Sequence, residues 1–102
     1  MIVALVTFHY DDEEHLERMN RAARERRHLY EGLPGLLQKL YWLDRERADT
    51  GGLYVWESRG RAEEFYGGAW REKATQAFGA SPTIRYLEVT DVVANTAVAV
   101  GR

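Results

Sequence analysis

The chain has 102 residues, enough for one domain spanning residues 1–102 with a modest hydrophobic core. A formal net charge of −2, from 14 basic and 16 acidic residues, gives no general electrostatic reason to bind nucleic acid or an anionic membrane. The absence of cysteine excludes disulfides, thiolate nucleophiles and cysteine-ligated metals, and it indicates a cytoplasmic protein.

The first predicted element is a strand from Ile2 to His9, and its nearly continuous hydrophobicity indicates a central strand buried on both faces. The run is too short for a signal peptide, and no run approaches the roughly 20 apolar residues that span a bilayer, so we expect a soluble protein. His9 shares its parity with Val3 and Leu5. It either forms a hydrogen bond at the strand end, the simpler interpretation, or acts as a catalytic base.

A helix is predicted from Asp11 or Asp12 to about Tyr30, and Asp11 with Glu14 has the spacing of a capping box. Apolar residues recur at three- and four-residue spacings, which predicts one face that packs on the sheet. These residues are Leu16, Met19, Ala22, Ala23, Leu29 and Tyr30. Arginines alternate with acids on the other face, so we interpret that face as solvated and self-paired rather than as a phosphate site.

Two β-rich runs on either side of a polar loop predict a hairpin in the middle of the chain. The second strand is predicted over 36–44, the loop over 45–50 and the third strand over 52–57. Gly51 and Gly52 allow a turn or a close backbone approach where the third strand begins.

The hairpin has an unusual composition for a plain core, because Lys39 and four large aromatic residues lie among leucines and valines. The aromatic residues are Tyr41, Trp42, Tyr54 and Trp56. Alternation places Lys39 and Tyr41 on one face of the second strand and Trp42 on the other. Such a mixture is typical of a sheet with one apolar face and a second face that lines an enclosed, partly polar space.

Ser58 is placed to cap a second helix that carries Ala62 and Tyr66 on one side. Gly67 and Gly68 interrupt this helix, which resumes over 69–77; the break is either a hinge or, as we favour, a corner between two short helices. The last strand is predicted over 83–93. The remaining residues, 94–102, form either an arm lying on a partner subunit or a disordered tail.

The predicted order is therefore strand, helix, strand, strand, helix, strand. This α+β order is that of the ferredoxin-like β-α-β-β-α-β fold, an antiparallel four-stranded sheet with both helices on one face. Because the strands carry apolar and aromatic residues of both parities, we expect two sheets to meet face to face in a homodimer and to enclose a cavity.

Several motifs resemble those of the YdhR-type monooxygenases, relatives of the antibiotic-biosynthesis monooxygenases. Pro34-Gly35 followed by Lys39-Leu40-Tyr41 is similar to a Pro-Gly and Lys-x-aromatic pattern, and Gly51-Gly52-Leu53-Tyr54-Val55-Trp56 to a Gly-Gly-x-Tyr-x-aromatic strand. Further matching residues are Ala62, Tyr66, Asp91 and Val92. The resemblance covers most of the chain, and it implies a homodimeric α/β barrel with a ligand pocket between the sheet and the helices of each subunit.

The resemblance also implies oxygenation of an aromatic or polyketide-like small molecule without metal, flavin or haem. The related quinone-forming and haem-degrading branches use an Asn, Trp and His set, with the histidine on the second helix. Here the histidines are His9, His15 and His28, all outside that helix, although Trp70 lies in its second half. Haem degradation is therefore not expected.

Oxygenation without a cofactor needs a substrate that forms an anion, a base, a group that holds the anion, and a dry pocket. Lys39 is our candidate to stabilise an enolate or phenolate, and His9 or Glu88 our candidate proton acceptor. The candidate substrate-binding residues are Tyr41, Tyr54 and Tyr86 as donors and Trp56 and Trp70 as apolar walls. The simpler interpretations are a cross-strand ion pair of Lys39 with Glu57 or Glu88, and aromatic packing in a dimer interface.

No metal-ligand spacing, Ser-His-Asp arrangement, phosphate loop or dinucleotide motif is visible, so neither a metal nor a cofactor is expected. Two alternatives to a monooxygenase stay open. One is a redox-neutral tailoring enzyme, such as a cyclase or isomerase, and the other is a non-catalytic dimeric module that binds a small aromatic ligand. A perturbed lysine or histidine in the pocket favours an enzyme, whereas a pocket filled by Tyr and Trp side chains favours the module.

Overall fold

The structure, a computed structural model, describes residues 1–95. From residue 96 onward, the predicted arm or tail lies outside the described residues. The elements in chain order are β1 (Ile2–His9), α1 (Glu13–Arg26), the 3-10 helix η1 (Arg27–Leu29), β2 (Leu36–Asp44), β3 (Asp49–Trp56), α2 (Arg59–Tyr66), α3 (Ala69–Phe78) and β4 (Thr83–Glu88).

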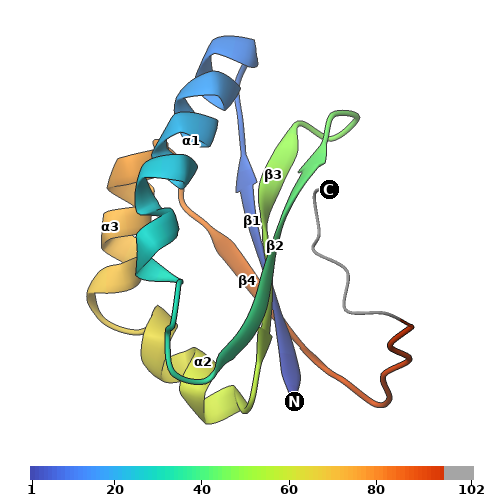
Figure 1. Cartoon of the computed structure of the whole chain (residues 1–102). Coiled ribbons are helices and arrows are strands. Elements are labelled where there is room, and N and C mark those ends of the chain that lie inside the picture. The colour runs from blue at the N-terminus through green and yellow to red at the C-terminus, as the bar shows by residue number, and fades with distance from the viewer. Residues whose placement is uncertain (96–102) are drawn as a thin grey trace.

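The four strands form one antiparallel sheet in the order β2-β3-β1-β4, and the helices cover one of its faces (Figure 1). This order and this layering confirm the ferredoxin-like α+β fold. We call the sheet face that carries the helices the inner face and the opposite one the outer face. In the described part of the chain, no helix is long and apolar enough to cross a membrane.

The central strand β1 is buried on one face rather than on two, which corrects the sequence prediction. Ile2, Ala4, Val6 and Phe8 are at most 6% exposed and point to the inner face, whereas the residues between them are half-buried. Antiparallel sheets commonly have one face packed on the core and one face that is more exposed, so a near-continuous apolar run does not by itself establish that both faces are buried.

The helix α1 begins one residue later than a cap at Asp11 would give. Asp12 is the N-cap, and its carboxylate accepts a hydrogen bond from the backbone N–H of His15 at 2.8 Å. The predicted capping box of Asp11 with Glu14 is therefore replaced by an Asp12 cap. The helix ends at Arg26, and η1 continues it for one tighter turn, so Tyr30 lies just beyond the helical segment.

Two strand boundaries differ from the prediction by more than one residue, for reasons of pairing. β3 starts at Asp49 because its ladder with β2 continues to the pair of Asp44 with Asp49. β4 ends at Glu88, rather than at residue 93, because Glu88 lies opposite Ile2 and the neighbouring strand β1 begins there. The hairpin therefore has a shorter loop than predicted, and the last strand is five residues shorter.

The second helix is broken where the two glycines predict a break. α2 is capped by Ser58, whose hydroxyl accepts from the backbone N–H of Arg61 at 3.2 Å, and it ends before Gly67. Gly68 has φ +56°, a conformation that favours glycine, and α3 starts after it. Gly67 and Gly68 therefore form the connection between two short helices.

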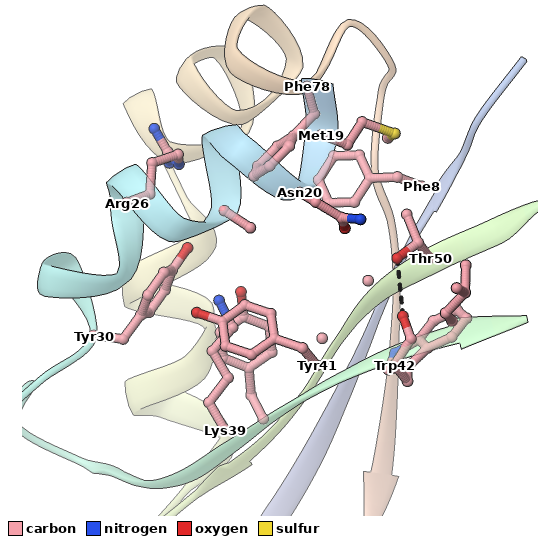
Figure 2. Close-up of a pocket in the computed structure, with 15 residues that line it drawn as sticks. Phe8, Met19, Asn20, Arg26, Tyr30, Lys39, Tyr41, Trp42, Thr50 and Phe78 are labelled. Atoms are coloured by element: carbon pink, nitrogen blue, oxygen red, sulfur yellow. Dashed lines mark hydrogen bonds between the residues drawn. The ribbon is translucent and has the colours of Figure 1, made fainter. Parts of the chain in front are cut away.

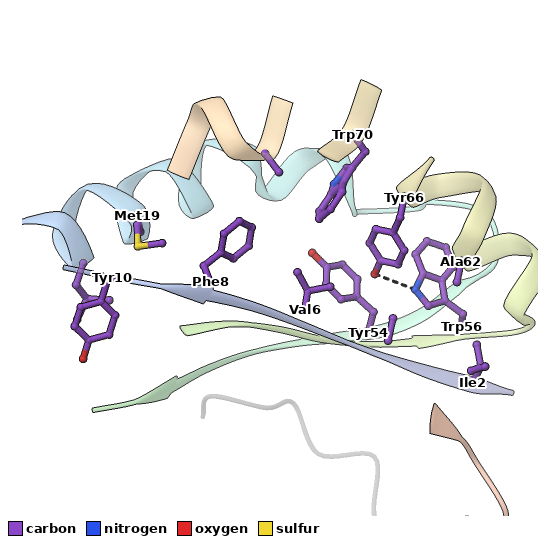
Figure 3. Close-up of a cluster of buried hydrophobic side chains, with 13 residues drawn as sticks. Ile2, Val6, Phe8, Tyr10, Met19, Tyr54, Trp56, Ala62, Tyr66 and Trp70 are labelled. Atoms are coloured by element: carbon purple, nitrogen blue, oxygen red, sulfur yellow. Dashed lines mark hydrogen bonds between the residues drawn. The ribbon is translucent and has the colours of Figure 1, made fainter. Parts of the chain in front are cut away.

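Aromatic side chains dominate the core between the sheet and α2 and α3 (Figure 3). Neighbouring ring centroids in this cluster lie 4.8 to 6.5 Å apart. Its members include Tyr54, Trp56, Phe65, Tyr66 and Trp70. Because this end of the inner face is filled, free space is left at the other end, beside α1.

Candidate active site

A cavity of about 220 Å³ lies between α1 and the inner face of β2 and β3 (Figure 2). The sheet side contributes Phe8, Lys39, Tyr41 and Tyr54, and the helix side contributes Met19, Asn20, Ala23, Arg26 and Phe78. Tyr30 closes the end next to η1. The cavity thus lies between the sheet and the helices of one chain, as the family resemblance implies, rather than on the outer face.

Glycine in β3 creates the space on the sheet side. Gly52 lies opposite Tyr41, two positions along from the pair of Lys39 with Tyr54 and on the same face of the sheet. A Cβ at Gly52 would lie 2.8 Å from the Tyr54 ring and 3.1 Å from Cε of Lys39. The Lys39 side chain can therefore extend into the cavity because residue 52 has no side chain of its own.

The Lys39 amine is surrounded by tyrosine rings. Its Nζ lies 3.4 Å from the ring centroid of Tyr30, 4.3 Å from that of Tyr41 and 4.6 Å from that of Tyr54. None of the ion pairs within residues 1–95 includes Lys39, so the predicted pairs with Glu57 or Glu88 are not formed. The charge of Lys39 is balanced by aromatic faces rather than by a carboxylate.

Burial and, to a lesser extent, the positive charge of Arg26 together lower the pKa of Lys39 from 10.5 to about 7. Burial has the opposite effect on the phenols, and it raises the pKa of Tyr41 and of Tyr54. At neutral pH the cavity therefore combines a lysine that is partly unprotonated with tyrosine hydroxyls that remain donors.

Arg26 gives the cavity a second cation. It is the last residue of α1, and its guanidinium carbon lies 5.7 Å from the ring centroid of Phe78. Its buried Nε has no hydrogen-bond partner among the described residues. No aspartate or glutamate is among the described residues that line the cavity, so this space favours an anion or a group that becomes one.

A second hollow of about 430 Å³ opens beside the first, between η1 and the edge strand β2. Tyr30, Lys39 and Tyr41 line both spaces. The Lys39 amine is therefore within reach of a ligand in either space, or of one longer ligand that occupies both.

The two predicted proton acceptors lie outside the cavity. His9 is on the outer face, its side chain is 65% exposed, and its Nδ1 lies 3.3 Å from the Asp49 carboxylate across the ladder. Glu88 is exposed at the end of β4, opposite Ile2. Neither side chain lines the cavity with Lys39.

Of the five predicted substrate-binding residues, Tyr41 and Tyr54 line the cavity, and the other three lie in the packed end of the inner face. Trp56 is 1% exposed, and its indole N–H donates to the Tyr66 hydroxyl at 3.2 Å (Figure 3). The guanidinium carbon of Arg59 lies over the Tyr86 ring, 4.6 Å from the centroid of that ring.

Trp70 supports the cavity indirectly. Its indole N–H lies 3.4 Å from the Tyr30 hydroxyl, to which it donates, and Tyr30 is the ring nearest to the Lys39 amine. The contact therefore joins the aromatic core to the wall of the cavity.

Sequence reasoning missed the contribution of α1 and the turn that follows it. Met19, Ala23, Arg26 and Tyr30 recur at spacings of four, three and four residues, which places them on one helical face. The predicted packing face includes Tyr30, whereas Arg26 is not among the candidate site residues. The signal that could have found them is this single stripe, in which an arginine replaces an apolar residue.

Within the described residues, no group of three or more His, Cys, Asp or Glu side chains could hold a metal ion. The ring nitrogens of His15, the buried histidine, lie 3.0 Å from the Asp11 backbone nitrogen and 2.8 Å from the Phe78 carbonyl. The polar side chains that line the cavity include the Lys39 amine, the Arg26 guanidinium, the tyrosine phenols, the Asn20 amide and the Thr50 hydroxyl.

Neither a family model nor a curated protein sequence matches the chain. Among solved structures, it is similar to a monooxygenase from the gene ActVA-Orf6 of Streptomyces coelicolor in complex with nanaomycin D, with TM-score 0.72, 17% identity, and 93% and 92% of the two chains covered. It is also similar to SnoaB, a cofactor-independent oxygenase from Streptomyces nogalater, with TM-score 0.63, 10% identity, and 92% and 97% covered.

A third similar structure is a dimeric ferredoxin-like protein of unknown function from Jannaschia sp. CCS1, with TM-score 0.68, 19% identity, and 86% and 98% of the two chains covered. At these identities the likeness establishes the fold. The chain is thus a ferredoxin-like α+β protein with a helix-covered cavity. Its fold is that of the antibiotic-biosynthesis monooxygenases, as the sequence motifs predicted.

Proposed function

We propose that this protein is a cofactor-independent monooxygenase that oxidises a small aromatic or polyketide-like phenol or enol in the cavity beside α1. The observation that carries the proposal is the Lys39 amine, which has a pKa of about 7 and lies among three tyrosine rings in a cavity whose described lining holds no carboxylate. The proposal draws further support from the shared fold with SnoaB, a cofactor-independent oxygenase.

Lys39 combines two roles, proton acceptor and partner of the substrate anion, that the sequence analysis predicts for different residues. As a neutral amine it accepts a proton from an acidic C–H or O–H of the substrate, and the ammonium that forms then pairs with the substrate anion. Tyr41 and Tyr54 donate hydrogen bonds to the same anion. This assignment makes a base from His9 or Glu88 unnecessary, which agrees with their positions outside the cavity.

The oxidation then proceeds from the anion. The carbanion form of the substrate gives one electron to dioxygen, and the two radicals combine to a peroxide on carbon. Lys39 returns its proton to the peroxide, and loss of water leaves a carbonyl group. One oxygen atom enters the product and the other leaves as water, so the reaction needs no external reductant.

Oxygen uptake with a panel of naphthols and anthrones tests the proposal. We expect the wild-type protein to consume dioxygen and to form, in equal amount, a product with one more carbonyl group than the substrate. We also expect kcat/KM to rise between about pH 6 and pH 8, because Lys39 loses its proton over this range. Lys39→Met is expected to lower kcat/KM by about a hundredfold or more, since positioned proton transfer contributes at least that much.

Lys73→Met is the matched control, because Lys73 is the other lysine of the chain and lies exposed on α3. It should leave kcat/KM unchanged. Wild-type turnover by Lys39→Met would contradict the assignment. Product of unchanged mass without oxygen uptake would favour the redox-neutral cyclase or isomerase, and tight binding without turnover would favour the ligand-binding module.

We also propose that two copies of the chain form a homodimer through the outer face of the sheet. The supporting observations are the apolar side chains on that face, including Val3, Leu5, Leu53 and Val55, and the description of a similar structure as dimeric. Such a dimer covers the outer face and leaves the cavity of each subunit on its inner face.

A further inference from the structure

The lining of the cavity includes Lys39 from β2 and Arg26 from α1, and it includes no carboxylate among the described residues. Figure 2 shows the Lys39 nitrogen directed into the cavity from the sheet, whereas Arg26 lines the cavity from α1 and its guanidinium lies against the Phe78 ring. Lys39 has no ion-pair partner within residues 1–95, and the buried Arg26 Nε has no hydrogen-bond partner there. Neither side chain is therefore held in an ion pair within the described part of the chain.

We propose that Lys39 is also a nucleophile that forms a Schiff base with small aldehydes or ketones carrying an acidic group, and that Arg26 binds this acidic group. A lysine amine becomes nucleophilic when it is desolvated or lies beside another cation, and Lys39 meets both conditions. The activity goes beyond the proposed oxygenation, since it needs neither dioxygen nor a substrate that loses a proton.

The reaction balances without an added reductant or oxidant. The electron pair of the neutral amine attacks the carbonyl carbon, and the proton that the nitrogen then loses passes to the carbonyl oxygen, which gives a carbinolamine. Loss of its hydroxyl as water leaves the imine, which is protonated in its reactive form, and hydrolysis returns the free amine. The buried phenols of Tyr41 and Tyr54 keep their protons at neutral pH and can donate hydrogen bonds to the carbonyl oxygen.

The tyrosine rings add a second element of selectivity. With ring centroids 3.4 to 4.6 Å from the amine, they surround the site where the iminium cation forms, and aromatic faces attract such a cation. The same rings provide flat apolar walls for an aromatic carbonyl compound. The structure thus favours an aromatic aldehyde with an acidic substituent over a small neutral aldehyde.

Reductive trapping under nitrogen tests this inference on the wild-type chain. The protein is incubated near pH 7 with 4-formylbenzoate and cyanoborohydride, with benzaldehyde as the uncharged counterpart, and adducts are located by peptide mass mapping. Lys39, Lys73 and the chain's first amino group compete in the same sample. We expect 4-formylbenzoate to label Lys39 at least about tenfold faster than Lys73.

Two variants separate the roles. Arg26→Gln should reduce the preference for 4-formylbenzoate over benzaldehyde by about tenfold, whereas Lys73→Arg should leave the labelling of Lys39 unchanged. Equal labelling of Lys39 and Lys73 in the wild-type chain would overturn the proposal, whether or not any variant folds. An unchanged preference in Arg26→Gln would overturn the role of Arg26.

The two proposals fail separately. Oxygen uptake without trapping of Lys39 would overturn only the Schiff-base proposal, and trapping of Lys39 without oxygen uptake would overturn only the proposed oxygenation.

Discussion

At the scale of single residues, the protonation of Lys39 results from two opposing effects. Removal from water disfavours the ammonium, and the nearby Arg26 disfavours it further. The faces of Tyr30, Tyr41 and Tyr54 favour the ammonium, each by about 0.5 to 2 kcal/mol. The pKa of Lys39 falls because burial outweighs these contacts.

This balance predicts a pH-dependent stability. Between about pH 7 and pH 10 the unfolded chain binds more protons at Lys39 than the folded chain, because the folded pKa of about 7 lies below the ordinary 10.5. The free-energy cost of burying the charged Lys39 ammonium is therefore present in full below pH 7, and it decreases as the pH rises. Lys39→Met should raise the free energy of unfolding by roughly 1 to 3 kcal/mol at about pH 6, and by less than half as much at about pH 9.

Urea unfolding of both proteins at the two pH values measures this difference. Lys73→Met serves as the control, since it removes an exposed lysine from α3 and should give the same difference from wild type at both pH values. A Lys39→Met variant less stable than the wild type at about pH 6 would contradict the account, because the tyrosine contacts would then outweigh burial.

Sequence alone could identify some of these residues and not others, for physical reasons. Lys39 and Tyr41 could be found because a lysine beside large aromatics is unusual in a strand that packs on helices. His9 and Glu88 share strands with buried residues, but parity and position at the strand end place them away from the cavity. Which wall Arg26 faces depends on how α1 lies on the sheet, and this packing is not encoded in local spacing.

At the scale of elements, two adjacent glycines of β3 have different functions. A Cβ at Gly51 would lie 1.9 Å from the backbone carbonyl oxygen of Val6, so the contact of β3 with β1 excludes any side chain there. A Cβ at Gly52 would instead approach the movable ends of Tyr54 and Lys39. Gly51 thus allows the close approach of β3 to β1, whereas Gly52 leaves room in the cavity for the side chains of Tyr54 and Lys39.

The corresponding alanine variants are a matched pair. Gly51→Ala should lower the free energy of unfolding by roughly 3 kcal/mol, because backbone atoms of two strands must separate. Gly52→Ala should cost about 1 kcal/mol or less, but it should slow the trapping of Lys39, whose stem must move. Urea unfolding and trapping of both variants test this, and equal stability losses would contradict the distinction between the two glycines.

The order of the elements could be read from the sequence because each one carries its own signal. The hydrophobic runs, the Ser58 cap and the break at Gly67 and Gly68 are local features, and they place β1, α2 and α3 correctly. Strand ends are not local. β3 extends to Asp49 and β4 stops at Glu88 because of the strands beside them, which no single stretch of sequence reveals.

At the scale of the whole molecule, the outer face presents apolar rows that run across the sheet. Leu40, Leu53 and Leu5 are successive cross-strand neighbours in one row, and Val55, Val3 and Leu87 follow each other in the next. Leu87 is 43% exposed. A contiguous apolar surface of this kind is typical of an interface, and a stable dimer buries about 1,200 to 2,000 Å² in total.

We therefore expect the wild-type chain to sediment as a dimer at micromolar concentration, and Leu53→Lys to sediment as a folded monomer. Leu53 lies on β3 in the interior of the sheet, where a lysine would place a charge in the middle of the buried interface without a partner. Leu29→Lys is the control, because Leu29 is 42% exposed and lies on η1, away from the outer face. Unchanged circular dichroism distinguishes dissociation from unfolding. A monomeric wild-type chain, or a Leu53→Lys variant that remains dimeric, would show that the outer face has another function.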